Sequence, residues 1–187
     1  MKLYIKNMVC NRCKMVVKTE LEKLGFSPVS VQLGEVELVQ ENLNTTQNEA
    51  IKEVLSKSGF ELLTDRKKQL TEQIKTTIIE LAHYQTEPLK SNLSEYLSKK
   101  LDTEYAYLSA IFSETEQSTI EKYFIQQKVE KAKELLTYGE HSLSEIAFQL
   151  NYSSVAHLSA QFKKISGQTP SQYKLNQDLS RKTLDEI

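Results

Sequence analysis

Two cysteines, Cys10 and Cys13, are the residues of this chain whose type and spacing most clearly suggest chemistry. They are the only cysteines in the sequence, and they form one C-x-x-C. This spacing lets two sulfurs converge on one point, where thiolates bind soft metal ions or exchange a disulfide. A bridge closing so short a loop would remove little chain entropy, which argues against a purely structural staple.

Three uses of Cys10 and Cys13 stay open on residue type alone: metal binding, a reversible disulfide, and a structural or vestigial pair. Two thiolates suit near-linear Cu(I), or half of a tetrahedral Zn²⁺ site completed by other ligands or a second chain. His83 and His141 lie far away in the sequence. The chain shows no nucleophile and base pair, no Gly-rich phosphate loop and no paired acid and base carboxylates, so we do not expect an enzyme.

The first 64 residues must position this pair, and their patterns predict the order strand, helix, strand, strand, helix, strand. The strands are expected at KLYIKNM, VSVQL, EVELV and FELL, with a tight hairpin at Gly34. The helices are expected from Cys13 to Gly25 and from Asn48 to Ser58. This βαββαβ order predicts a ferredoxin-like domain over residues 1–64, with the cysteines where the first strand gives way to the first helix.

Met8 extends the cysteine pair to M-x-C-x-x-C. On a βαββαβ frame, this motif resembles the heavy-metal-associated domain of copper chaperones and metal-transport ATPases. Gly59 and Phe60 resemble the Gly-aromatic pair of the ATPase versions, whereas Asn7 stands where that family usually has Gly. The resemblance implies that the two cysteines bind a thiophilic metal ion, Cu(I) or Zn²⁺.

Residues 65–88 form the predicted linker. Apolar residues at helical spacing, among them Leu70, Ile74 and Ile78, predict one amphipathic helix from Asp65 to Tyr84, which Thr86, Glu87 and Pro88 then break. Two interpretations remain open for this helix: it packs on one domain as a connector, or it pairs with a second copy to form a homodimer.

From Leu89 onward the pattern is helical throughout, so the fold class is α+β with an all-α domain at residues 89–175 and a frayed tail at 176–187. The predicted helices are Asn92 to Lys100, Glu104 to Glu114, Thr119 to Leu136, Ser142 to Leu150, Val155 to Ser166, and Ser171 to Tyr173.

Two stretches of this helical part share one layout: SNLSEYLSKKLDTEYAYLSAIF and HSLSEIAFQLNYSSVAHLSAQF. Each has a Ser before a short helix, a brief polar turn, and a second helix that contains L-S-A-x-F. A short helix, a tight turn and a second helix form the helix-turn-helix plan, in which the second helix enters the major groove. The duplication predicts two such units, joined by the helix Thr119 to Leu136, and double-stranded DNA as the partner.

The segment LSEIAFQLNYSSVAHLSAQFKKISGQTPSQYK resembles the signature of the AraC/XylS family of bacterial regulators, and the match runs from about Leu93 to Lys174. The resemblance implies a DNA-binding transcription regulator. In the second unit, the base-facing residues it implies are Ser153, Ser154, Ala156, His157 and Ala160, with Lys163 and Lys164 reaching phosphates.

In the first unit, the corresponding residues are Glu104, Tyr105, Ala106, Ser109 and Ala110, with Ser113 further along. Ala110 and Ser113 occupy places that commonly hold Arg or Lys in this family, and Glu104 and Glu114 would face phosphates unfavourably. Because each missing phosphate contact lowers affinity, we expect weak binding or a strong dependence on dimerisation.

The net charge of the chain, −1, offers no global attraction to nucleic acid, so any basic surface must come from local placement. No apolar run approaches the roughly 20 residues that span a bilayer, and the start lacks a secretory signal, so we expect a cytoplasmic protein without a membrane partner. Two other functions remain open: a metal-trafficking protein with a helical interaction module, and a thiol redox switch without metal.

Overall fold

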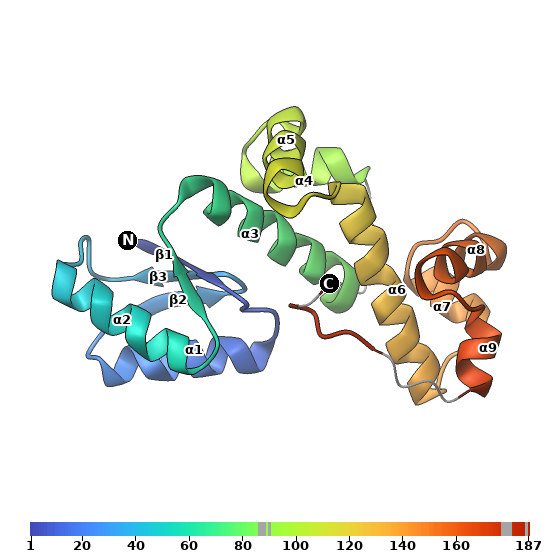
Figure 1. The fold of residues 1–187 in the computed structure, drawn as a ribbon, viewed down its shortest axis with the longest axis horizontal. Coiled ribbons are helices and arrows are strands. Elements are labelled where there is room, and N and C mark those ends of the chain that lie inside the picture. The colour runs from blue at the N-terminus through green and yellow to red at the C-terminus, as the bar shows by residue number, and fades with distance from the viewer. Residues whose placement is uncertain (86–88, 90, 177–180, 186) are drawn as a thin grey trace. The chain divides into compact units, whose positions relative to one another are not determined.

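The computed structural model describes residues 1–85, 89, 91–176, 181–185 and 187 (Figure 1). The chain forms two compact units. The first comprises Met1–Thr77 and Ala106–Thr115, and the second comprises Ile78–Tyr105 and Glu116–Ile187. Because these units do not follow the order of the chain, the domain ranges deduced from the sequence remain predictions. The predicted helix break at residues 86–88 and part of the predicted tail lie outside the described residues.

The first unit is built on a small antiparallel sheet whose four strands pair in the order β2-β3-β1-β4. The strands are β1 (Lys2–Lys6), β2 (Pro28–Gln32), β3 (Glu35–Leu38) and β4 (Glu61–Leu63). Helices α1 (Asn11–Lys23) and α2 (Thr45–Lys57) follow β1 and β3 and lie along one face of the sheet (Figure 1). The element order is therefore βαββαβ, as the periodicities predicted.

The core of this unit lies between the sheet and these two helices. In β1, side chains alternate between the two faces, so that Ile5 is fully buried while its neighbour Lys6 is exposed. Val17 of α1 and Ile51 of α2 are also fully buried in this core. Burying each such aliphatic side chain stabilises the fold by about 1.5–3 kcal/mol.

Helix α2 begins three residues before the predicted start at Asn48, because a capping box precedes it. The Asn44 side chain accepts a hydrogen bond from the Gln47 N–H at 2.8 Å, and the Gln47 side chain accepts one from the Asn44 N–H at 3.0 Å. These two bonds satisfy backbone donors that a helix start otherwise leaves free.

Gly34 closes the β2–β3 hairpin with a φ of +73°, in the left-handed region that favours glycine. A Cβ at this position would lie 2.9 Å from Cγ2 of Thr76 in helix α3 (Arg66–Ile79). The glycine therefore allows the turn to form, and it also lets α3 pack closely against the hairpin.

The prediction of one continuous helix from Asp65 to Tyr84 was wrong in part. The α-helical hydrogen-bond pattern ends at Ile79, and Glu80–Tyr84 form a π-helical turn, η1. Such turns widen the helix locally, and α-helical periodicity in a sequence does not reveal them.

All the regular secondary structure in the described residues of the second unit is helical. Its helices are α4 (Leu93–Leu101), α6 (Ile120–Tyr138), α7 (Leu143–Gln149), α8 (Val155–Ser166) and α9 (Pro170–Leu175). Helix α5 (Tyr105–Glu116) has all but its two end residues in the first unit. None of the helices in the described part of the chain combines the length and the hydropathy needed to cross a bilayer.

Candidate nucleic-acid interface and thiol pair

Helices α7 and α8 form the second predicted helix-turn-helix, and their apolar sides meet in one core with α6 and α9. Ile146, Leu150, Leu158 and Phe162 are buried there. Between the two helices, Asn151 has a φ of +56°, a conformation that Asn tolerates better than most residues. The turn is thus fixed by packing on both sides and by local backbone chemistry.

The opposite side of α8 is open. All seven residues assigned to DNA contact in this unit are exposed: Ser153, Ser154, Ala156, His157, Ala160, Lys163 and Lys164. The Ser154 side chain caps the helix by accepting from the His157 N–H at 3.1 Å, and Ser153 Oγ lies 3.1 Å from His157 Nδ1. Serine, histidine and lysine side chains are therefore ordered on one exposed face that carries no acidic residue.

Helix α9 closes this unit behind α8. Its Tyr173 is 2% exposed and packs edge-on against Phe162, with ring centroids 5.5 Å apart. Thr169 and Gln172 form a capping box, and Pro170 occupies the first turn. These residues of the sequence signature thus have structural roles, holding α8 from the side that does not face outward.

In the first predicted helix-turn-helix, only part of the helix face assigned to DNA contact is exposed on α5. Ala106 and Ala110 are exposed, as are Glu104 before the helix and Ser113 further along it, whereas Ser109 is half-buried. No lysine or arginine lies within α5. This helix therefore offers small and hydroxyl side chains without positive charge.

Tyr105, the first residue of α5, is half-buried, and its hydroxyl donates to the Glu121 carboxylate at the start of α6. Burial and this carboxylate both raise the pKa of Tyr105. Base contact by this residue stays a prediction, but the hydroxyl already has a partner that the sequence did not indicate.

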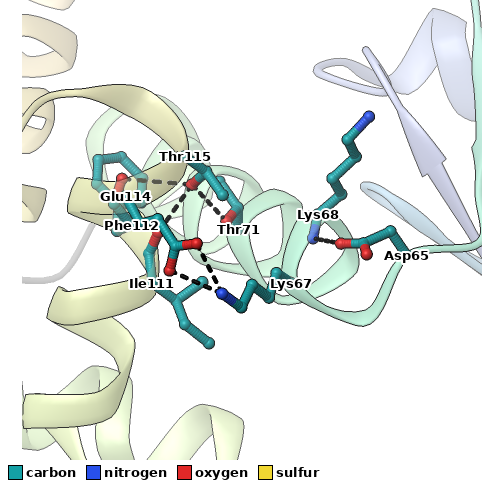
Figure 2. A network of polar contacts seen from close by, with 8 residues as sticks. All are labelled: Asp65, Lys67, Lys68, Thr71, Ile111, Phe112, Glu114 and Thr115. Atoms are coloured by element: carbon teal, nitrogen blue, oxygen red, sulfur yellow. Dashed lines mark hydrogen bonds and ion pairs between the residues drawn. The ribbon is translucent and has the colours of Figure 1, made fainter.

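Helix α5 also contacts α3, and Figure 2 shows the network that joins them. Lys67 Nζ lies 2.7 and 2.8 Å from the two carboxylate oxygens of Glu114. Next to this pair, the hydroxyls of Thr71 and Thr115 lie 2.8 Å apart. Glu114 is therefore paired with Lys67 in this structure, and the expectation that it faces phosphates unfavourably stays a prediction.

No sequence signal indicates this contact, because Lys67 and Glu114 are 47 residues apart. Asp65, which precedes α3, accepts from the Lys68 N–H at 2.9 Å and so caps that helix (Figure 2). Capping keeps the first turn of α3 ordered, and this turn carries Lys67.

The thiol pair lies between β1 and the first turn of α1. Both cysteines are free thiols and half-buried, and their sulfurs are 3.2 Å apart. Met8 is fully buried in the core of this unit, and Cys13 packs against the same core. No cluster of three or more His, Cys, Asp or Glu side chains suited to a metal ion occurs among the described residues.

The two thiols differ in acidity. Burial acts to raise the pKa of Cys10, but hydrogen bonds from the backbone and thiol of Cys13, together with Arg12, outweigh it and lower that pKa. Burial and the hydrogen bond with Cys10 raise the pKa of Cys13. Cys10 is therefore the thiol that ionises first.

Asn7 ties the loop before the cysteines to two other elements of the first unit. Its φ of +71° lies in the left-handed region, where Asn is the commonest substitute for Gly. Its side-chain amide donates to the Gly59 carbonyl at 3.0 Å, and its backbone N–H donates to Glu72 Oε1 of α3 at 3.2 Å. The departure from Gly at this position thus supplies a contact that glycine lacks.

Comparison with known proteins supports the identity of the helical half. A family described as "Helix-turn-helix domain" matches residues 97–176. An uncharacterized HTH-type transcriptional regulator of Staphylococcus aureus is 34% identical over 92 residues, which are 49% of this chain and 12% of that protein. This chain thus spans only a small part of the length of the curated relatives it matches.

Two solved structures are similar in fold. The C-terminal domain of AraT, a response regulator from Geobacillus stearothermophilus, is 25% identical with a TM-score of 0.51, covering 64% of this chain and 94% of that one. A transcriptional regulator described as AraC-type from Chromobacterium violaceum is 17% identical with a TM-score of 0.51, covering 62% of this chain and 99% of that one. The carboxy-terminal half of this chain therefore carries a helix-turn-helix domain.

Proposed function

We propose that this chain is a non-enzymatic transcription regulator that binds double-stranded DNA through α8 and α5. The observation that carries the proposal is the exposed face of α8, where His157, Lys163 and Lys164 stand outward on the second helix of a helix-turn-helix. That helix is the one that enters the major groove in such domains. DNA as the partner makes the cytoplasm the expected compartment.

The side chains of this face suit groove contacts of different kinds. Ser153 and Ser154 exchange hydrogen bonds with base edges, Ala160 meets a thymine methyl group, and the two lysines pair with phosphates. Helix α5 supplies no cation, so we infer that its unit adds shape and hydroxyl contacts but little charge. A homodimer would double the set of phosphate contacts and so compensate for this deficit.

We propose further that Cys10 and Cys13 bind a thiophilic metal ion. The βαββαβ element order of this unit supports a split βαβ, ferredoxin-like arrangement as the frame for the two thiols. Two half-buried thiols at 3.2 Å, with no third ligand among the described residues, fit two-coordinate Cu(I) or one half of a shared Zn²⁺ site. A bound ion would supply a fixed positive charge between the sulfurs.

The contacts of α3 support a route from the thiol pair to α5. Asn7, three residues before Cys10, donates to Glu72 of α3, and Lys67 and Thr71 of the same helix contact Glu114 and Thr115. A shift of the loop before Cys10 would therefore act on α3 and, through it, on α5. We propose that this helix relays the state of the cysteines to the DNA-binding face.

A reversible Cys10–Cys13 disulfide is the second candidate for sensing, favoured by the short distance between the sulfurs. In that reaction the two thiols lose two electrons and two protons to an oxidant such as oxidised glutathione, and the new S–S bond replaces the bound metal as the signal. The remaining alternative is a different function: a metal-trafficking protein whose helical half is an interaction module.

Genome-wide DNA capture by the purified full chain tests these alternatives together. It is carried out without metal, with Cu(I), with oxidised glutathione, and with the Cys10→Ser variant. Enriched sites whose occupancy changes with Cu(I), but not in C10S, support the proposal. Tight Cu(I) binding without any enriched DNA site would support the trafficking function instead. DNA occupancy that changes with the oxidant but not with Cu(I) would support the redox switch.

A further inference from the structure

A cavity of about 280 Å³ lies within the second unit, away from the exposed face of α8. Four elements line it: η1, the start of α4, the middle of α6 and the end of α7 with its turn. Leu81, Leu93 and Leu150 give it apolar walls, and Asn92 and Asn151 contribute amides. The mixture of apolar walls and a few polar groups is typical of sites for small organic molecules.

Lys128 of α6 places a positively charged group at this cavity. Its Nζ lies 3.9 Å from the ring centroid of Tyr152 and 5.3 Å from that of Phe124. No carboxylate lies within ion-pair distance of it among the described residues. Burial lowers the pKa of Lys128 to about 8, so at pH 7 it still carries its proton, in a site where no anion balances the charge.

The other ionisable groups around the cavity do not balance Lys128. Lys131 is paired with Glu134 at 2.7 Å, and Glu134 also pairs with Arg181 at 2.9 Å, so that carboxylate is already shared by two cations. His83 is neutral at pH 7, because burial lowers its pKa to about 4, and its Nε2 lies 2.9 Å from Gln127 Oε1. None of the described residues that line the cavity is acidic. Among the described residues, Lys128 is therefore the one cation at the cavity without a counter-ion.

We propose that this cavity binds a small organic monoanion, with its carboxylate group on Lys128 and its apolar part against Leu81, Leu93 and Leu150. A half-buried cation without a counter-ion costs free energy, and an anion with a short hydrocarbon part relieves this cost while covering the apolar walls.

Leu150 and Asn151, which begin the turn between α7 and α8, line the same cavity as Lys128 of α6. An occupant would therefore bridge the helix that joins the two helix-turn-helix units and the turn that orients the recognition helix. The site is separate from Cys10 and Cys13, so its test does not depend on metal binding or on the DNA proposal.

Isothermal titration calorimetry of the full chain tests the site with 3-phenylpropanoate, its uncharged amide, and inorganic phosphate. We expect the carboxylate to bind and the amide to bind at least tenfold more weakly. Phosphate binding as tightly as the carboxylate would assign the cavity to inorganic anions and overturn the organic part of the proposal. At pH 8, titrations in buffers of different ionisation enthalpy should show proton uptake, because the bound anion restores the full charge of Lys128.

The variant Lys128→Met should lose binding and proton uptake, whereas Lys122→Met, at an exposed lysine of the same helix outside the cavity, should keep both. Circular dichroism and thermal unfolding show whether K128M is folded; if it is not, the conservative K128R variant, which keeps the charge, should still bind the carboxylate but not the amide.

No binding by the wild-type chain, equal binding of carboxylate and amide, or unchanged affinity in folded K128M would overturn the proposal. So would a K128M variant that loses only DNA affinity, since Lys128 would then be a phosphate contact.

Discussion

At the scale of single residues, two lysines supply the charge of the exposed face of α8. The chain as a whole carries a net charge of −1, so it does not attract DNA through its global charge. Between His141 and Lys174, however, Glu145 is the only acidic residue, and Lys163 and Lys164 lie together in the last turn of α8. The local placement of these residues therefore decides the electrostatics of the interface.

Replacing Lys163 or Lys164 with Gln should weaken DNA binding similarly for all sequences. Each variant should also reduce the slope of log affinity against log salt by about 1, because one phosphate contact is lost. Fluorescence anisotropy with a captured site across a KCl series measures both effects. Lys57→Gln, which changes an exposed lysine of α2, is the matched control, and an unchanged slope in both α8 variants would contradict the assignment.

His83 should make the fold less stable in mild acid. Its folded-state pKa of about 4 lies below the unfolded value of about 6.5, so between these values the unfolded chain binds more protons and stability falls as the pH falls. We expect a loss of about 2 kcal/mol between pH 7 and pH 5 from this residue. Urea unfolding at both pH values measures it, and His83→Gln should show a smaller loss; the same loss in both proteins would refute this origin.

At the scale of elements, the short helices of the second unit depend on their caps and on packing. Helix α7 has only seven residues, and isolated helices of that length are not stable in water. The Ser142 side chain accepts from the Glu145 N–H at 3.2 Å, and the Glu145 carboxylate accepts from the Ser142 N–H at 2.7 Å. This capping box fixes where α7 begins and hence where its buried residues point.

Ser142→Ala should therefore lower the free energy of unfolding by about 1 kcal/mol. Ser144→Ala, at an exposed position inside the same helix, should change it by less than about 0.5 kcal/mol. Urea unfolding followed by circular dichroism compares the two variants. Equal effects would mean that the capping box does not stabilise α7.

The contact between α3 and α5 should matter for regulation more than for stability. An exposed ion pair such as Lys67–Glu114 contributes little to folding, yet it joins the proposed relay to the first recognition helix. We expect Lys67→Glu to reduce the ratio of DNA affinities with and without Cu(I) toward 1, and the charge-swapped double variant K67E/E114K to restore it.

The new charge at position 114 changes DNA affinity equally with and without Cu(I), so the ratio of the two affinities cancels this direct effect. Lys57→Glu breaks the equally exposed Lys57–Glu53 pair of α2 and should leave the ratio unchanged. If K67E keeps the wild-type ratio, α3 does not transmit the signal through this pair.

At the scale of the whole molecule, the proposed metal and DNA sites must influence each other equally. If Cu(I) changes the affinity for DNA by some factor, DNA must change the affinity for Cu(I) by the same factor. We expect a factor of roughly 5 to 100. Fluorescence anisotropy measures the effect of Cu(I) on DNA affinity. Competition with a Cu(I) chelator, with and without DNA, measures the effect of DNA on Cu(I) affinity. The double variant Cys10→Ser/Cys13→Ser should abolish both effects, and a Cu(I) effect on DNA affinity that persists in this variant would show that the metal acts at another site.

The sequence alone was sufficient for features that depend on neighbours a few residues apart. The strand alternation around Ile5, the hairpin at Gly34 and the helix Val155–Ser166 were all predicted, because side-chain periodicity repeats within two to four residues. The duplicated L-S-A-x-F layout likewise indicated a helix-turn-helix pattern. The start of α2 differs from the predicted one because the capping box of Asn44 and Gln47 begins the helix three residues earlier.

Only the tertiary structure decided which distant side chains meet. It paired Lys67 with Glu114, connected Asn7 to Glu72, and placed the Lys128 ammonium group over two aromatic rings. It also ended the α-helical pattern of the linker at Ile79. The physical reason is that ion pairs and cavities depend on how whole elements pack, and the spacing of residues along one chain carries no information about separations of 40 or more positions.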